Sequence, residues 1–227
     1  MKALLLLSGG LDSSASFVLS VEPIALALTF DYGQEAAQRE FTQAASLCNY
    51  FSVPHKTVGL PHFTDLPNQG ALLSQGELPT LTKTELDDYE SASRTADQVW
   101  IPNRNGVFIE VAAQMAESLG LSTVLVGFNR EEAATFPDNS LEYLQAINSA
   151  LSYSTRGRVR AHAPVGHMVK TEIVRKLRER DFPFSLLWSC YRNNEKMCGR
   201  CESCQRLKRA LSQNEVKHDF FEDSILS

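Results

Sequence analysis

The sequence contains no apolar run long enough to cross a membrane. Its opening run, residues 3–7, is followed directly by Ser-Gly-Gly and is too short for the apolar region of a secretion signal. No other stretch approaches the roughly 18 apolar residues of a membrane span. We therefore expect a cytoplasmic protein with no membrane partner.

The sequence also lacks an excess of basic residues. Its 22 Lys and Arg are outnumbered by 27 Asp and Glu, which gives a formal net charge of −5. A surface devoted to nucleic acid is expected to be basic, so a small ligand is favoured over DNA or RNA. With 227 residues, 43% of them hydrophobic, the chain can form one well-packed domain, alone or with a small appendage.

Cysteine is scarce and unevenly placed. Four of the five cysteines fall within residues 190–204, in the pattern C-x7-C-x2-C-x2-C. Such spacing disfavours a disulfide framework, and four thiolates that close a tetrahedron are typical of structural Zn²⁺. A [4Fe–4S] cluster is the alternative with the same ligands, and a disulfide switch is a weaker one. The predicted metal ligands, called the cysteine cluster below, are Cys190, Cys198, Cys201 and Cys204, whereas Cys48 is expected to be a buried core thiol.

Apolar and amphipathic segments alternate along the start of the chain. Residues 3–7 and 24–30 are short apolar runs typical of buried parallel strands. Residues 53–58, which begin beside Pro54, are predicted as a third strand, and residues 12–20 and 34–50 as helices. This alternation predicts an α/β fold with a doubly wound parallel sheet. Further helices are predicted at 106–119, 141–152 and 169–179, and further strands at 123–127 and 159–163.

Two segments depart from this alternation. Residues 59–100 contain several Pro and Gly residues and a series of acids, so we expect a long irregular flap or insertion there. Residues 184–227 contain the cysteine cluster and a short basic helix. The sequence thus predicts an α/β domain at 1–183 and a small helical zinc-binding region at 184–227.

The most informative stretch is Ser-Gly-Gly-Leu-Asp-Ser-Ser at residues 8–14, where the first strand ends and the first helix begins. Backbone N–H groups of a glycine turn, together with the positive end of a helix dipole, bind anions without a charged side chain. The spacing matches neither the Walker pattern nor G-x-G-x-x-G. A phosphate-binding loop of another kind is therefore expected.

This loop resembles the pyrophosphate loop of the ATP pyrophosphatase (PP-loop) superfamily, whose members transfer AMP to a substrate oxygen and release pyrophosphate. The resemblance implies the adenine nucleotide alpha hydrolase-like fold, and ATP binding by Ser8, Gly9, Gly10, Leu11, Asp12, Ser13 and Ser14. Asp12 would also help to place Mg²⁺. Because open α/β sheets bind ligands at the carboxyl ends of their strands, Phe30, Tyr32 and Gln34 are expected to contact the adenosine.

Further motifs follow in an order that covers almost the whole chain. They are Phe-Asp-Tyr-Gly-Gln at 30–34, Ile-Pro-Asn-Arg-Asn at 101–105, Ala-Pro-Val at 163–165 with Lys170, and Ser-Cys-Tyr at 189–191 before the remaining cysteines. Together with the loop, they resemble the QueC family of 7-cyano-7-deazaguanine synthases in queuosine biosynthesis. The resemblance implies an ATP-dependent C–N ligase, which converts 7-carboxy-7-deazaguanine and ammonia to 7-cyano-7-deazaguanine through adenylate and amide intermediates. It also implies a homodimer.

Three side chains are candidates for catalysis. Asp12 would hold Mg²⁺, Arg104 would offset negative charge on phosphate with two donors, and Lys170 would, by resemblance, face the nucleotide phosphates. Simpler roles stay open, namely a loop salt bridge for Arg104 and an ordinary surface position for Lys170. Asn103 and Asn105 either orient the ligand or close the turn before the next helix.

One stretch departs from the family pattern of Asn, then Asp, then Tyr-Pro-Asp-Cys. This chain has Asn-Arg-Glu-Glu at 129–132 and Phe-Pro-Asp-Asn at 136–139. A carboxylate of Glu132 or Asp138 can accept the adjacent N–H donors of a guanine-like edge, so the changes bear on substrate identity rather than on ATP use. The predicted substrate-binding residues are Asn103, Asn105, Asn129, Glu132, Phe136 and Asp138.

Two other functions are compatible with parts of the sequence. One is another PP-loop adenylating ligase that acts on a different acid or on tRNA, although the acidic balance disfavours tRNA. The other is a non-catalytic zinc-knuckle module that binds RNA through Arg200, Arg206, Lys208 and Arg209. A solvated basic helix explains those four charges equally well, and the RNA-binding alternative leaves the loop at 8–14 unexplained.

Overall fold

The computed structural model describes residues 2–67, 70–73, 78–80 and 85–222 of the chain. At its centre is one five-stranded sheet in the order β3-β2-β1-β4-β5, in which every strand pair is parallel. The strands are β1 (Ala3–Leu6), β2 (Ile24–Asp31), β3 (His55–Gly59), β4 (Thr123–Leu125) and β5 (Arg160–His162).

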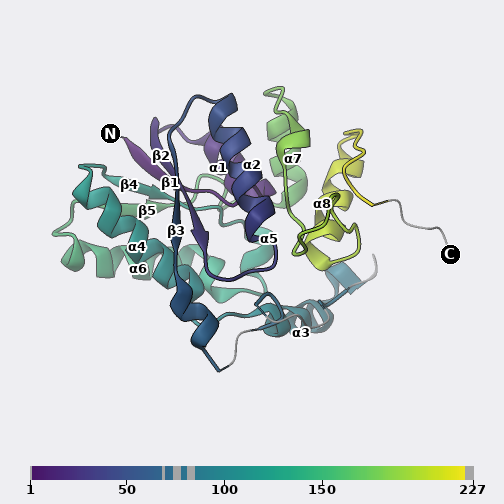
Figure 1. Cartoon of the computed structure of the whole chain (residues 1–227), viewed down its shortest axis with the longest axis horizontal. Coiled ribbons are helices and arrows are strands. Elements are labelled where there is room, and N and C mark those ends of the chain that lie inside the picture. Colours follow the sequence, from purple (N-terminus) through teal and green to yellow (C-terminus); the bar gives the residue numbers. More distant parts are fainter. Residues whose placement is uncertain (1, 68–69, 74–77, 81–84, 223–227) are drawn as a thin grey trace.

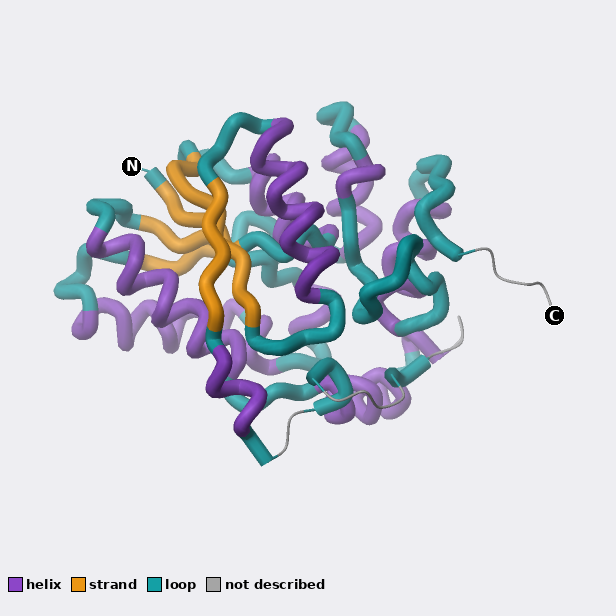
Figure 2. Tube along the Cα trace, in the orientation of Figure 1, coloured by secondary structure: helices purple, strands orange, loops and turns teal. Residues whose placement is uncertain are grey.

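Helices cover both faces of this sheet (Figure 1, Figure 2). On one face lie α1 (Leu11–Leu19), α2 (Ala37–Tyr50) and α7 (Lys170–Arg178), and on the other lie α4 (Arg104–Ser118) and α6 (Leu141–Ser154). The remaining helices are α3 (Tyr89–Val99), α5 (Arg130–Ala133) and α8 (Glu202–Gln213). The predicted doubly wound α/β fold is therefore confirmed.

Strand β1 is apolar throughout because both of its faces are packed. Leu4 belongs to the core that contains Ile109 of α4, whereas Leu5 belongs to the core that contains Leu47 of α2 and Ile173 of α7. Successive side chains of a strand point to opposite faces, so one short apolar run contributes to both cores.

The strand order reverses between β1 and β4. From β1 the chain adds β2 and β3 in one direction, whereas β4 and β5 extend the sheet in the other. The loops that follow β1 and β4 therefore diverge, and open α/β sheets bind their ligands in the crevice at such a switch point. The loop at residues 8–14 directly follows β1 and lies at this crevice.

Part of the segment 59–100 is more regular than the sequence predicted. Residues Pro61–Asp65 and Glu85–Asp87 form short 3-10 helices, and α3 follows them. The expectation of an irregular segment is therefore wrong for α3, whose buried face is made mostly of small or polar side chains such as Ala92, Thr95 and Ala96 rather than large apolar ones. Residues 68–69, 74–77 and 81–84 of the predicted flap lie outside the described residues.

The C-terminal region packs directly on the α/β part of the chain. Leu207 and Leu211 of α8 are buried in the same core as Ile173 and Leu177 of α7. Residues 223–227 of this predicted region lie outside the described residues. In the part of the chain that the structure describes, no helix is long and apolar enough to span a membrane.

Gly127, two residues after β4, touches the start of α1. A Cβ atom at this position would lie 2.6 Å from the Ser13 nitrogen and 2.8 Å from the Ser13 Cα. Backbone atoms at these distances cannot move aside as the end of a flexible side chain can. The contact therefore requires glycine and fixes how closely the two walls of the crevice approach each other.

Replacing Gly127 with Ala should force α1 and β4 apart. Overpacking of this kind costs about 1–3 kcal/mol in the free energy of unfolding, which urea denaturation would measure. Gly59→Ala is the matched control, because a Cβ at Gly59 has no atom within 4 Å. Equal stability of the two variants would contradict the close approach.

Candidate functional site

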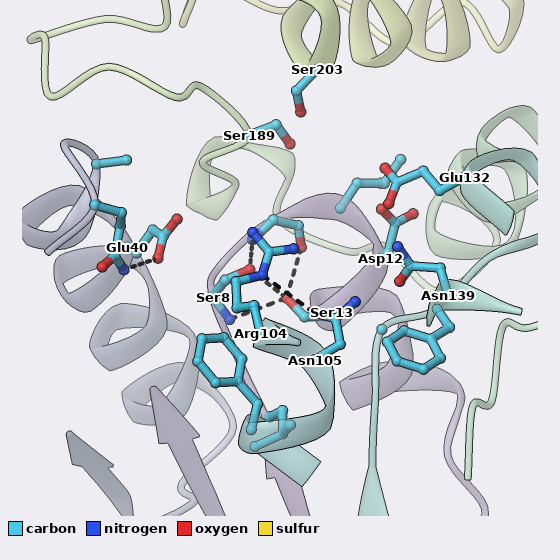
Figure 3. Close-up of a pocket in the computed structure, with 18 of the residues that line it drawn as sticks. Ser8, Asp12, Ser13, Glu40, Arg104, Asn105, Glu132, Asn139, Ser189 and Ser203 are labelled. Carbon is cyan, nitrogen blue, oxygen red and sulfur yellow. Dashed lines mark hydrogen bonds between the residues drawn. The ribbon is translucent and has the colours of Figure 1, made fainter. Parts of the chain in front are cut away.

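A cavity of about 280 Å³ opens at the carboxyl ends of β1, β2 and β4. Its walls come from the loops after these strands, from the starts of α4 and α7, and from the segment around the first cysteine of the cluster. Figure 3 shows Glu40 on one side of the cavity, Asp12, Glu132 and Asn139 on the other, and Ser8, Ser13 and Arg104 between them.

Most of the residues predicted for the site line this cavity. They are Ser8, Gly10, Leu11, Asp12, Ser13, Phe30, Tyr32, Gln34, Arg104, Asn105, Glu132, Phe136 and Lys170. The predicted residues that do not line it are Gly9, Ser14, Asn103, Asn129 and Asp138. The structure thus brings together residues from segments far apart in the sequence.

The loop at 8–14 has the geometry of an anion site. Gly10 caps α1 without a side-chain hydrogen bond, so the first N–H groups of that helix are free to meet a ligand. The Ser8 and Ser13 hydroxyls lie 3.2 Å apart, and the Gly10 N–H donates to Ser8 Oγ at 3.3 Å. Gly9 has a φ of +79°, a conformation that glycine adopts without strain.

Lys170 lies between two carboxylates at one end of the cavity. Its Nζ atom is 2.6 Å from Glu132 Oε1 and 3.1 Å from Asp12 Oδ2, and its side chain is only 5% exposed. The simpler interpretation of Lys170 as a surface lysine is therefore wrong. Burial alone would lower the pKa of Lys170, but Asp12 and Glu132 raise it above its ordinary value.

The pKa values of Asp12 and Glu132 are shifted in opposite directions. Burial raises the pKa of Asp12 to about 6, although Lys170 lowers it. Burial also acts to raise the pKa of Glu132, but Lys170, together with Arg206 and Arg104, outweighs this effect and holds the pKa of Glu132 below its ordinary value. Asp12 Oδ1 is buried without a hydrogen-bond partner among the described residues, so the carboxylate has one oxygen left for a cation such as Mg²⁺.

Arg104, the first residue of α4, lies over the ring of Tyr32 with 5.9 Å from its Cζ to the ring centroid. Its Nε donates to Asn105 Oδ1 at 3.4 Å. The ion pairs of the described residues do not include Arg104, so the loop salt bridge is not observed. The guanidinium therefore has donors available to a ligand in the cavity.

Gln34 uses its amide to shape the turn after β2. Its Oε1 accepts from the Tyr32 N–H at 3.0 Å, while its Nε2 donates to the Phe30 carbonyl at 3.0 Å and to Glu40 Oε2 at 2.8 Å. Gln34 thus holds Glu40, which the sequence analysis missed, at the cavity wall. Burial raises the pKa of Glu40 to about 7. The only available signal was its position in the first turn of the helix that follows the Phe-Asp-Tyr-Gly-Gln motif.

The residues predicted to bind the substrate divide between the cavity and its support. Asn129 is fully buried and caps α5, because its Oδ1 accepts from the backbone N–H groups of Glu131 and Glu132. Asn103 has a left-handed conformation, with a φ of 52°, at the start of α4. Phe136 lines the cavity, as does Asn139, which the sequence analysis did not select. Asn129 and Asn103 thus support the cavity walls from outside.

Asp138 lies behind the cavity wall. Burial raises its pKa above the ordinary value, although Arg104 acts in the opposite direction. Its Oδ1 atom is buried and has no hydrogen-bond partner among the residues that the structure describes.

The cysteine cluster is preformed as a possible metal site. Its four Sγ atoms are buried and lie within 4.8 Å of one another, with 3.9 Å between those of Cys198 and Cys204. A tetrahedron with metal–sulfur bonds of about 2.3 Å places sulfur atoms about 3.8 Å apart. Backbone N–H groups also approach Sγ atoms of Cys190 and Cys198 at 3.3–3.4 Å. The donor set and its spacing fit a closed tetrahedral metal site, whereas Cys48 is a buried core thiol as predicted.

The chain just before the cysteine cluster covers the loop at residues 8–14. The Trp188 N–H donates to the Gly9 carbonyl at 2.8 Å, and Arg39 of α2 lies over the Trp188 ring at 5.1 Å. Trp188 and its neighbours Ser189 and Tyr191 line the cavity. The cysteine cluster is therefore adjacent to the site rather than remote from it.

The basic residues of α8 do not form a free basic face. Arg206 is 8% exposed and pairs with Glu131 and Glu202, and Arg209 also contacts Glu131. Lys208 lies over the Phe221 ring at 4.8 Å. The interpretation of these charges as a solvated helix is therefore wrong for Arg206, and a guanidinium paired within the protein is a poor contact for RNA.

Comparison with known proteins identifies close relatives over almost the whole chain. Residues 2–215 match the family model described as queuosine biosynthesis protein QueC. A 7-cyano-7-deazaguanine synthase from Pelotomaculum thermopropionicum is 47% identical, covering 92% of this chain and 96% of that relative. Those from Bdellovibrio bacteriovorus and Methanosarcina mazei are 43% and 42% identical, covering 97% and 98% of this chain and 98% of each relative.

Replacing Glu40 with Gln tests the electrostatics at its end of the cavity. The ordinary pKa of 4.5 applies to the unfolded chain, whereas the folded pKa is about 7, so the folded state binds the extra proton between these pH values. The stability of the wild type should therefore fall relative to Glu40→Gln as the pH rises from about 4 to about 8. Each unit of difference between the folded and unfolded pKa corresponds to about 1.4 kcal/mol, and solvent screening in the open cavity reduces the effect. We therefore expect the wild type to lose about 1–2 kcal/mol in free energy of unfolding relative to Glu40→Gln over this pH range.

Urea denaturation of both proteins across this pH range measures the difference. Other titrating groups are common to the two proteins and cancel in the comparison. Parallel stability curves would contradict the raised pKa of Glu40.

Proposed function

The chain belongs to the QueC family of queuosine biosynthesis proteins, which are enzymes, and we propose that it is the ligase that makes 7-cyano-7-deazaguanine from 7-carboxy-7-deazaguanine, ammonia and ATP. The names of the relatives support this product. The observation that carries the proposal is one cavity in which an anion-binding loop meets buried cations and hydrogen-bonding groups. Such a cavity suits a reaction between a nucleoside triphosphate and a small polar acid.

The end of the cavity near the phosphate loop supports binding of ATP. The free N–H groups of α1 and the Ser8 and Ser13 hydroxyls would hold the departing pyrophosphate. Lys170 and Arg104 would offset negative charge that develops on the transferred phosphate. Asp12, through its unpartnered Oδ1, would hold Mg²⁺, which shields phosphate charge when bound.

The wall of the cavity that contains Phe136 and Asn139, on the same side as Asp12 and Glu132 (Figure 3), supports binding of the deazapurine. Glu132 is engaged by Lys170, so we assign reading of the guanine-like edge to Asn139, which lines the cavity, rather than to Glu132 or to Asp138. Phe136 provides an apolar surface for the ring. The three positions that differ from the family pattern, 132, 136 and 139, all line the cavity, and the last two provide an aromatic ring and an amide for recognition.

The reaction requires activation of a poor electrophile in two rounds. A carboxylate oxygen of the acid attacks the α-phosphorus of ATP, and pyrophosphate leaves. Ammonia attacks the resulting carbonyl carbon, AMP leaves and a proton is lost, which gives the amide. The amide oxygen then attacks the α-phosphorus of a second ATP and pyrophosphate leaves; loss of AMP, with both amide N–H protons given up over the two steps, leaves the nitrile. The protein supplies positioning and charge stabilisation, which contribute large rate enhancements without a nucleophilic side chain.

The activity test follows pyrophosphate and AMP release from Mg-ATP with 7-carboxy-7-deazaguanine and ammonium, with products identified by mass spectrometry. We expect the nitrile, with two ATP consumed per product. Asp12→Asn should lower kcat/KM by about 100-fold or more, because it removes charge at the phosphate site. Asp181→Asn, at an exposed aspartate after α7, is the matched control and should retain activity.

Each result of this assay has a distinct meaning. Cleavage of ATP without nitrile would contradict the proposed acid while keeping an adenylating ligase. Absence of pyrophosphate release with every acid tested would overturn the enzymatic proposal.

The cysteine cluster is proposed to bind one structural Zn²⁺ per chain. Four thiolates leave no position for water, so the metal would stabilise folding. Cys198→Ser should abolish zinc binding and lower the free energy of unfolding by more than about 3 kcal/mol. Cys48→Ser, the control, should retain the zinc content. Metal analysis and urea denaturation measure both effects, and iron with visible absorbance would instead indicate an iron–sulfur cluster.

A further inference from the structure

Arg206 is a buried guanidinium that joins two parts of the protein. It lies in α8, between Cys204 and the core leucines of that helix. Its Nε and Nη2 atoms contact Glu202 Oε1 at 2.9 and 2.8 Å, and its Nη1 contacts Glu131 Oε1 at 2.8 Å. Glu202 is held from its other side by the Thr95 hydroxyl of α3, at 2.8 Å from Oε2. The guanidinium therefore has a fixed position and connects α8 to α5.

Glu131 connects Arg206 to the start of α7. Its Oε1 is taken by Arg206 and Arg209, and its Oε2 accepts the backbone N–H of Lys170 at 3.3 Å. Lys170 is the first residue of α7, where a backbone N–H has no acceptor within its own helix. The Glu131 carboxylate supplies that acceptor and so fixes the helix start.

The next residue, Glu132, holds the other end of Lys170. Its Oε1 contacts Lys170 Nζ at 2.6 Å, and the same Nζ contacts Asp12 in the phosphate loop at 3.1 Å. The dipeptide Glu131-Glu132 thus binds both the backbone and the ammonium of one lysine. A continuous chain of short contacts runs from Arg206, beside the cysteine cluster, to Asp12.

We infer that Arg206 is a positioning residue, which acts through Glu131 to place Lys170 against Asp12 for the proposed nucleotide chemistry. Without Arg206, Glu131 would keep only Arg209 as an ion-pair partner among the described residues, and Glu202 would have none. The less neutralised Glu131 carboxylate would then attract Lys170 more strongly, and Lys170 would be drawn away from Asp12. Displacement of a catalytic group by about 1 Å can cost about 100-fold in rate.

A direct contact between Arg206 and the substrate is the competing explanation, because Arg206 also lines the cavity. The two explanations differ in the role of Glu131, which is absent from the cavity wall. Positioning requires that Glu131→Gln reproduce the effect of Arg206→Met and that the double variant be no worse than either. A direct contact predicts nearly normal activity for Glu131→Gln and multiplied effects in the double variant.

The test uses the metal-loaded full chain in two measurements. The first is kcat for pyrophosphate release. It should fall about 10- to 100-fold in Arg206→Met and in Glu131→Gln, with no further loss in the double variant. The second is hydrogen exchange at the Lys170 amide without any ligand, which should accelerate at least about tenfold in both single variants. Arg200→Met, at an exposed arginine beside the same cysteines, is the control and should change neither.

These measurements separate the inference from the proposed function on which it rests. A wild type that releases no pyrophosphate would defeat the proposed function, while exchange at Lys170 would still test the coupling. Unchanged exchange in the two single variants, or multiplied kinetic losses in the double variant, would overturn the inference. If Arg206→Met loses its metal or does not fold, Glu131→Gln and Arg206→Lys provide the same test, because Lys keeps the charge but cannot bridge two carboxylates in the same way.

Discussion

The site depends on one buried ammonium, that of Lys170. A charged group removed from water is tolerated only when oppositely charged groups lie close to it. The Lys170 ammonium has two such partners, Asp12 in the loop at residues 8–14 and Glu132 in α5. Three segments that are distant in the sequence must therefore meet at fixed distances for the lysine to be buried at all. The requirement links the helix after β1 to the helix after β5, and it determines the shape of the cavity between them.

The cysteine cluster contributes to the cavity as well as to local folding. A small closed metal site usually stabilises a region whose own hydrophobic core is limited. Here the chain before it donates a hydrogen bond to the phosphate loop through Trp188, and the helix after it contributes Arg206 to the ionic chain. Its folding and the geometry of the cavity are thus connected by direct contacts. We regard the region as a wall of the site.

The two ends of the cavity differ in their electrostatics. At one end, Lys170, Arg206 and Arg104 hold the pKa of Glu132 below its ordinary value although burial acts to raise it, and such cations suit bound phosphates. At the other, Glu40 accepts a hydrogen bond from the Gln34 amide, and burial raises the pKa of Glu40 to about 7. This difference would orient the proposed ATP, which is anionic at one end and neutral at the other.

Local patterns were enough to predict the parallel sheet, the glycine turn at residues 8–14 and the grouping of the four cysteines. Each of these features is recognisable from residues close together in the sequence, although the cysteine spacing left zinc and an iron–sulfur cluster as alternatives. α3 was missed because its buried face consists mostly of small or polar residues. The partnerships of Lys170, Glu40 and Arg206 were decided only by the tertiary structure, since ordinary charged residues carry no sign of burial. Packing between segments distant in the sequence determines which charged side chains are buried next to one another, and residue spacing along the chain does not reveal these pairs.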